Sequence, residues 1–242
     1  MREPHPEPTG IQRRANTIYE TIRARICTSR YPPGRTLREG DLADEFGVSR
    51  SPIRRVLAKL EEAKLLEVKH GVGAQVTEIR PEAYVAACEV RMLLAMHSGP
   101  YFTDPFPTDA PAFFKDCRGK FLALEAGDLH AFADVNNLFF VGALNLIENS
   151  YLREIQMNLF FETARMWLVK LPELDWDSTV QDIAREIDEV IRAIEGRDPV
   201  GLGLVLRNSI HAALRRFQEP ESGAAPGSGD WRPAPWPDHT SG

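Results

Sequence analysis

Two serines and three arginines gather in the run Ser49-Arg50-Ser51-Pro52-Ile53-Arg54-Arg55. Guanidinium groups can make bidentate hydrogen bonds to guanine in the major groove of DNA, or can pair with phosphates. When a helix-turn-helix lies on DNA, such cationic groups at the start of its second helix would enter the groove. A solvated surface explains this short run equally well, so the elements around the run must decide between the two interpretations.

A second candidate for DNA contact follows directly in the sequence. The stretch LLEVKHGVGAQVTEI alternates as a strand does on both sides of a glycine-containing turn, His70 to Gly73. Because glycine lacks a side chain, His70, Gly71 and Gly73 could pass close to the DNA backbone or the minor groove. This pattern predicts a β-hairpin wing.

The segments before the wing carry the order that such a domain needs. Apolar residues at steps of three and four predict a helix over 11–29, which the Tyr31-Pro-Pro-Gly34 segment ends. A short helix is expected over 39–46, and Gly47-Val48 turns the chain. Ser49 or Ser51 can cap the next helix, and Pro52 fits its first turn. The predicted order is therefore helix, helix, turn, helix, hairpin.

Beyond Pro81 the sequence contains no convincing strand. Apolar residues at helical spacing predict helices near 82–98, 110–126, 128–149, 151–170, 178–196 and 199–218, for which an antiparallel bundle is the natural architecture. The fold class is therefore predicted to be mainly α, with an N-terminal winged helix-turn-helix and a C-terminal all-α bundle.

The charge of the chain is distributed unevenly. The net charge is −6, yet residues 11–80 hold 14 Lys and Arg against 9 Asp and Glu, a balance of +5. Residues 1–10 carry −1, which leaves −10 for residues 81–242. A basic N-terminal third joined to an acidic remainder predicts that contact with nucleic acid is confined to one end.

Composition sets the remaining expectations. With 43% hydrophobic and 26% charged residues the chain can bury a core. It lacks an apolar run of membrane length and an apolar signal-peptide core, so we expect no membrane association and a cytoplasmic location. Three widely spaced cysteines, Cys27, Cys88 and Cys117, are expected to be buried thiols. The expected organisation is a flexible tail (1–10), a DNA-binding domain (11–78), a linker (79–81), a helical domain (82–219) and a disordered tail (220–242).

The stretch YPPGRTLREGDLADEFGVSRSPIRRVLAKLEEAKLLEVKHGVGAQV resembles the DNA-binding domain of the GntR family of bacterial regulators over about 65 residues. The matching positions include the proline-glycine turn, the leucine-alanine pair at 42–43, the GVSR motif and the wing glycines. The resemblance implies that Arg50 and Arg54 contact DNA. A third family arginine is replaced by Gly40, and Arg38 stands two residues earlier. The predicted DNA-contact set is Arg38, Ser49, Arg50, Ser51, Arg54, His70 and Gly71.

Residues 82–218 resemble, more weakly, the FadR-type (FCD) ligand domain of the same family. Its marks are Arg91, Phe139 ahead of Glu148-Asn149-Ser150-Tyr151-Leu152, and Ala193-Ile194-Glu195-Gly196-Arg197-Asp198. Many such domains hold a divalent metal on an aspartate and three histidines. Here Asn136 replaces the acid, while Phe140 and Ile187 replace two histidines. The last histidine falls near Ser209, with His211 close by. We therefore expect neither a metal nor another cofactor.

Apolar and aromatic side chains stand in place of those metal ligands. Core packing is the simpler explanation for most of them. The alternative is a more apolar effector pocket with polar contacts from asparagine or arginine, in which a buried arginine would suit a carboxylate. The predicted effector set is Arg91, Asn136, Asn137, Phe140, Arg165 and Ile187.

These observations favour a transcriptional repressor that binds a palindromic operator in double-stranded DNA as a homodimer and responds to a small carboxylate or apolar effector. The alternative is a DNA-binding dimer whose helical domain is a ligand-free scaffold. An enzyme is not expected, because the sequence contains no nucleophile elbow, phosphate loop, HExxH motif or acid/base pair.

Overall fold

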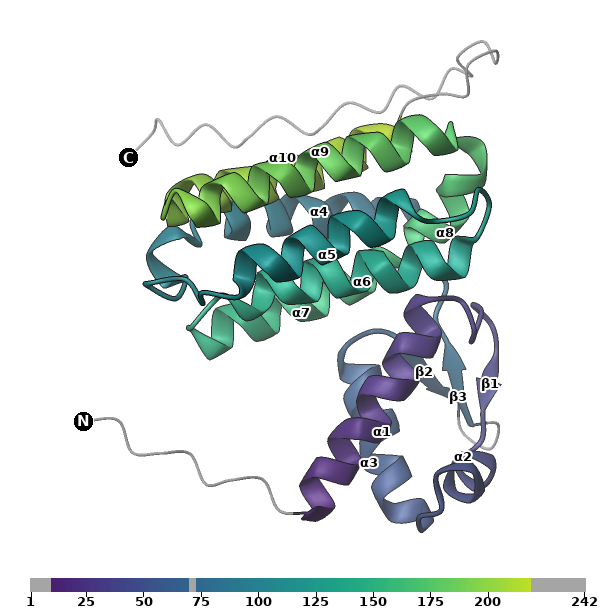
Figure 1. The fold of residues 1–242 in the computed structure, drawn as a ribbon. Helices are drawn as coiled ribbons and strands as arrows, with labels where there is room; N and C mark the ends of the chain where they lie inside the picture. The colour runs from purple at the N-terminus through teal and green to yellow at the C-terminus, as the bar shows by residue number, and fades with distance from the viewer. Residues whose placement is uncertain (1–9, 70–72, 219–242) are drawn as a thin grey trace, which may run out of the picture.

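The computed structural model describes residues 10–69 and 73–218, which form two helical parts joined near residue 80 (Figure 1). The predicted tails fall outside these residues, except Gly10, which begins the first helix. The N-terminal part contains α1 (Gly10–Cys27), β1 (Thr36–Leu37), α2 (Glu39–Phe46), α3 (Arg50–Glu62), β2 (Leu66–Lys69) and β3 (Gly73–Val76). This order confirms the predicted winged helix-turn-helix.

The wing strands belong to a three-stranded antiparallel sheet in the order β1-β3-β2. Thr36 pairs with Gln75, and Leu66 pairs with Val76. The sequence did not predict β1, because two residues are too few for an alternating pattern to be recognised. Gly73 has a φ of +120°, and a Cβ there would lie 2.8 Å from the Leu37 carbonyl oxygen. The close approach of β1 to β3 therefore requires glycine.

The turn between α2 and α3 is built on Gly47. Its φ of 59° and ψ of 45° place it in the left-handed region, where it ends α2. Helix α3 then packs its buried residues against α1 and α2. The shared core of this domain includes Ile18, Ile22, Leu42, Ile53, Val56, Leu57 and Leu60.

The C-terminal part is a bundle of helices: α4 (Pro81–Met96), α5 (Ala110–Leu122), α6 (Leu129–Asn145), α7 (Ser150–Ala164), α8 (Met166–Lys170), α9 (Trp176–Glu195) and α10 (Pro199–Gln218). Short 3-10 turns lie at Gly99–Tyr101 and Leu171–Glu173. Asp128, Asn149 and Asp175 cap α6, α7 and α9 by accepting hydrogen bonds from backbone N–H groups.

Helix α10 packs on α4 and α9, α5 packs on α9, and α7 packs on α4 and α6 (Figure 1). The helix expected over 151–170 is divided at Arg165 into α7 and α8. Past Pro81, the described residues contain no strand beyond an isolated bridge between Phe102 and Ile147. The bundle interior is aromatic, with Phe114, Phe121, Phe132, Phe139 and Phe160 almost fully buried.

Two further expectations concern membranes and thiols. No helix among the described residues is long and apolar enough to cross a membrane. All three cysteines are buried and free. Burial raises the pKa of Cys27 to about 12 and that of Cys117 to about 11, so both thiols stay protonated at neutral pH.

One carboxyl between α9 and α10, whose side chain is 19% exposed, should make stability depend on pH. Desolvation raises the pKa of Glu186 to about 7, although Arg216 lies 3.6 Å away. The folded state therefore holds a proton that the unfolded chain releases above its ordinary pKa of 4.5. The free energy of unfolding should fall as the pH rises from 4.5 to 7 and then stay level.

Glu186→Gln should accordingly raise the free energy of unfolding by about 1–3 kcal/mol at pH 8 and change it little at pH 5. Urea unfolding at both pH values measures this difference. Glu189→Gln, on the exposed side of the same helix, is the matched control. An equal effect of Glu186→Gln at the two pH values would contradict the assignment.

Candidate nucleic-acid interface and helical-domain site

The start of α3 presents the predicted cationic surface. Arg50, Ser51, Arg54 and Arg55 are exposed, while Ile53 of the same turn is completely buried. Ser49 occupies the N-cap position with an extended backbone, but its side chain makes no capping hydrogen bond. The expectation of a serine cap was therefore right about the position and wrong about the bond. An uncapped helix start leaves backbone N–H groups directed toward an incoming phosphate.

Arg54 is held in place by a carboxylate of α2. Its Nε and Nη2 atoms each donate a hydrogen bond of 2.9 Å to the Glu39 carboxylate. These bonds hold the pKa of Glu39 below its usual value. The Arg54 side chain remains 71% exposed, so the pair lies open to solvent at the helix-turn-helix surface. Glu39 thereby orients Arg54, and a phosphate approaching Arg54 must share it with Glu39.

Gly40, which stands in place of the third arginine of the resembled motif, lies beside the Arg50 side chain. A Cβ at Gly40 would lie 3.5 Å from Nη2 of Arg50. The guanidinium of Arg50 therefore covers Gly40, and a large side chain there would compete with it for this space. Arg38 is the exposed N-cap residue of α2. The sequence shows that the arginine is replaced, but only the structure shows that the Arg50 side chain packs over Gly40.

The predicted wing contacts His70 and Gly71 lie outside the described residues. The strands on either side of them are placed, and Lys69 pairs with Gly73 at the end of the hairpin. Five of the predicted contacts thus lie exposed on α2, on α3 or at the turn between these helices: Arg38, Ser49, Arg50, Ser51 and Arg54.

In the bundle, Arg91 on α4 is buried, and no acidic residue of the described ranges is its partner. Its Nη1 atom donates a 2.8 Å hydrogen bond to the hydroxyl of Thr163, and its guanidinium lies 5.5 Å and 5.3 Å from the rings of Phe140 and Phe160. No carboxylate of the described residues forms an ion pair with it. Desolvation lowers the pKa of Arg91. Arg91 and Phe140, two predicted effector residues, are therefore brought together.

The remaining bundle residues leave no donor set for a metal. The ring of Phe140 stacks on Phe160 with centroids 5.1 Å apart, and Ile187 is completely buried. Across the described parts of the chain, no three His, Cys, Asp or Glu side chains converge. His211 instead lines a surface depression with Asp182 and Arg216. Zinc and similar ions need three or more N, O or S ligands, so these residues do not fit a bound metal.

The two asparagines differ in their surroundings. Asn136 is 3% exposed, one turn before Phe140 on α6. The Oδ1 atom of Asn137 is buried without a hydrogen-bond partner. A buried acceptor without a donor costs free energy, which is more easily understood at a binding position than in a packed core.

Arg165 has contacts different from those expected. It was expected to supply a polar contact within the bundle, but its guanidinium donates to Thr77, the residue that follows β3 in the N-terminal part. Nη1 lies 2.7 Å from the carbonyl oxygen of Thr77, and Nη2 lies 3.1 Å from its hydroxyl. Sequence periodicity places Arg165 near a helix end but cannot show that this end meets the strand leaving the wing.

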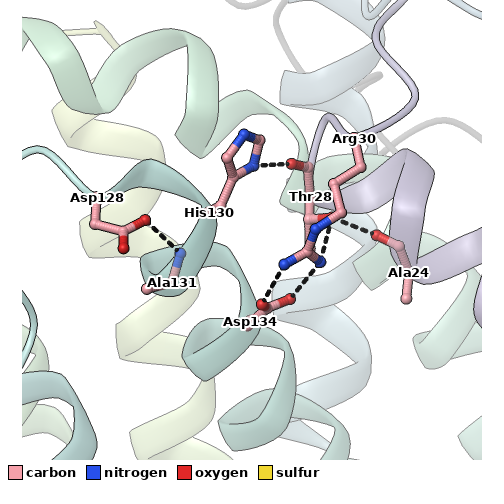
Figure 2. A network of polar contacts seen from close by, with 7 residues as sticks. All are labelled: Ala24, Thr28, Arg30, Asp128, His130, Ala131 and Asp134. Atoms are coloured by element: carbon pink, nitrogen blue, oxygen red, sulfur yellow. Dashed lines mark hydrogen bonds and ion pairs between the residues drawn. The ribbon is translucent and has the colours of Figure 1, made fainter.

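A second polar junction joins the segment after α1 to α6 (Figure 2). Arg30 makes two hydrogen bonds, of 3.2 Å and 2.9 Å, to Asp134. Nδ1 of His130 lies 2.7 Å from the Thr28 carbonyl oxygen. His130 and Arg30 were not predicted as functional residues, because neither belongs to a recognisable motif.

Comparison with known proteins supports this geometry. Residues 14–76, which span α1 to β3, match the gntR family of bacterial regulatory proteins. The probable D-xylose utilization operon transcriptional repressor of Paenarthrobacter nicotinovorans is 25% identical over 189 residues, 76% of this chain and 80% of that protein. The gluconate operon transcriptional repressor of Bacillus subtilis (strain 168) is 30% identical over 158 residues, 62% of this chain and 60% of that protein.

Two solved structures share the fold. E. coli McbR/YncC superposes with a TM-score of 0.65 at 17% identity, covering 85% of this chain and 99% of that one. A putative transcriptional regulator GntR from Rhodococcus sp. RHA1 gives 0.64 at 17% identity, with 85% and 98% covered. The two curated relatives are transcriptional repressors and not enzymes.

Proposed function

We propose that this chain, a DNA-binding regulator with a GntR-type winged helix-turn-helix, represses transcription as a homodimer on a palindromic operator. The observation that carries the proposal is the arginine surface at the start of α3, where Arg50 and Arg54 stand exposed beside the turn. A dimer would present two such helices to successive major grooves about 34–36 Å apart. Named repressors among the relatives support repression as the outcome.

Selection from a pool of random DNA duplexes tests this proposal. The full-length protein should enrich an inverted repeat whose half-sites are spaced by about one helical turn. Enrichment of a single, unrepeated site would contradict the dimeric arrangement, and absence of any enriched sequence would contradict specific recognition.

An apolar surface of the bundle supports the homodimer. Leu93 on α4 is 50% exposed, Leu204 on α10 is 44% exposed, and Ile155 on α7 is 51% exposed. These helices are neighbours, because α4 packs against both α10 and α7. Val90, Met96 and Val200 extend the same two helix surfaces. Exposed apolar side chains gathered on packed helices are typical of a protein interface.

We also propose that a small carboxylate effector binds Arg91 within the bundle and modulates operator binding. The supporting contacts are the guanidinium over Phe140 and Phe160 and the neutral partners of Arg91, the Thr163 hydroxyl and the Cys88 thiol. Asn136, Asn137 and Ile187 complete the expected surroundings. The aromatic rings beside Arg91 suit a site that recognises its ligand through a cation and aromatic rings. A ligand-free scaffold, the alternative, would not require a buried cation that lacks an acidic partner among the described residues.

Stability measurements separate these two alternatives. Arg91→Met should raise the free energy of unfolding by about 1–3 kcal/mol, because a buried charge without an acidic partner costs more than a thioether of similar length. Urea unfolding of the effector-free protein provides the measurement, with the exposed Arg192→Met as the control. A destabilised Arg91→Met protein would make Arg91 a structural residue and favour the scaffold.

A further inference from the structure

A pocket of about 590 Å³ lies where the DNA-binding domain meets the bundle. Its walls come from residues 75–80, from the first turn of α4, from the C-terminal end of α7 and from the turn after α3. This volume is within the usual range of small-molecule sites, which are often found between domains. Both domains line the pocket, so a ligand there would contact the segment that joins them.

The most buried polar group in the pocket wall is Arg165, which is 3% exposed. Its two hydrogen bonds go to neutral acceptors, the carbonyl and hydroxyl oxygens of Thr77, and its Nε atom has no hydrogen-bond partner in the described part of the chain. Glu162 lies in the same wall, but its ion pair is with Lys64 at 3.8 Å. A ligand carboxylate would give Arg165 charge-assisted bonds, which are roughly twice as strong as bonds to neutral acceptors.

The other charged groups in the wall restrict the ligand class. Lys64 and Arg80 are cationic, whereas Glu67, Glu78 and Glu162 are acidic, so with Arg165 the wall carries three groups of each sign. A simple anion would satisfy Arg165 but would meet three carboxylates. A molecule with both a carboxylate and an ammonium group matches both sets of charges.

We propose that this pocket binds a small amphoteric metabolite with the chemistry of a free amino acid, whose carboxylate replaces Thr77 as the partner of Arg165. This site is separate from the Arg91 cluster. Thr77 directly follows β3, so its release frees the joining segment from α7. The contacts between the segment after α1 and helix α6, at Arg30 and His130, do not involve Thr77 (Figure 2). Ligand binding would then shift the wing strands relative to the bundle.

Calorimetric titration of the full-length protein in the absence of DNA tests this binding. The probes are L-aspartate and succinate, which share a carbon skeleton and differ by the ammonium group. L-Aspartate should bind with a dissociation constant of about 1 mM or below, and succinate more weakly. Failure of both probes to bind, or tighter binding of succinate, would overturn the proposal.

Two variants locate the binding. Arg165→Met should weaken L-aspartate binding at least about tenfold, because a charged hydrogen-bonding partner is lost. Thr77→Val should tighten it about two- to tenfold, since it removes a competing acceptor. Arg192→Met is the control and should change nothing. If Arg165 were only structural, Thr77→Val would not tighten L-aspartate binding. If Arg91→Met were the only variant that lost L-aspartate binding, the ligand would lie in the bundle.

The change in DNA affinity caused by the ligand rests on the proposed function, whereas the titration does not. If the protein binds L-aspartate but no operator, the pocket proposal stands and the proposed regulatory function is contradicted. If the protein binds operator but neither probe, the proposed regulatory function stands and the pocket proposal is contradicted.

Discussion

Replacing Arg50 with alanine is expected to weaken specific operator binding by about 1–3 kcal/mol, which is roughly five- to 150-fold. Arg50 is exposed at the N-terminal end of α3, the end by which the recognition helix of a helix-turn-helix contacts base edges in the major groove. Fluorescence anisotropy with a duplex obtained by selection measures the change. Arg185→Ala removes an exposed arginine of α9 and is the matched control. Equal affinity of the Arg50→Ala and control proteins would contradict the assignment of α3 as the recognition helix.

Because Arg54 pairs with Glu39, Arg54→Ala is expected to weaken operator binding more than Arg50→Ala does. Arg54→Ala removes a cation and also leaves Glu39 unpaired at the surface proposed to face the phosphates. Glu39→Gln should act in the opposite direction and strengthen binding to unrelated DNA, because it removes a negative charge and releases Arg54. If Arg54→Ala in the Glu39→Gln background cost as much as it does alone, Glu39 would have no electrostatic role.

The second large effect is expected at the apolar surface of the bundle. Leu93→Asp or Leu204→Asp would place a carboxylate in the proposed dimer interface, and the chain should become monomeric. A monomer can engage only one half-site, so operator affinity should fall by about 100-fold or more. Sedimentation velocity and anisotropy report the two changes.

Val169→Asp provides the control for these substitutions. Val169 is 59% exposed on α8, outside the apolar surface of α4, α7 and α10. It should leave both assembly and operator binding unchanged. Dimers that persist in Leu93→Asp and Leu204→Asp would show that the subunits meet elsewhere.

Much of the architecture follows from local patterns. The helix stripes at steps of three and four, the Gly47 turn and the glycines of the wing each act over a few residues, so periodicity and turn chemistry suffice to predict them. The boundaries moved by only a few residues at α1, α6 and α9. Strand β1 was missed because its pairing with β3 is a long-range contact that two residues do not encode.

The candidate sites were predictable to different degrees. Arg50 and Arg54 belong to a recognisable motif, so their exposed positions were expected. The pairing of Arg54 with Glu39 was not, because it arises from the packing of α2 against α3. Arg91 and Phe140 were expected near each other and are. Arg165 was expected with them, yet it binds Thr77. Its position follows from how the two domains meet, and no local pattern in the sequence records that arrangement.

The most direct test of operator recognition compares the affinity of the full-length protein for the selected operator with its affinity for a scrambled duplex at physiological salt. Specific recognition by two α3 helices predicts binding to the operator tighter by a factor of about 10³ or more. Equal affinity for the two duplexes, with the same dependence on salt, would show that the arginine surface contacts only phosphates and would contradict a sequence-specific repressor.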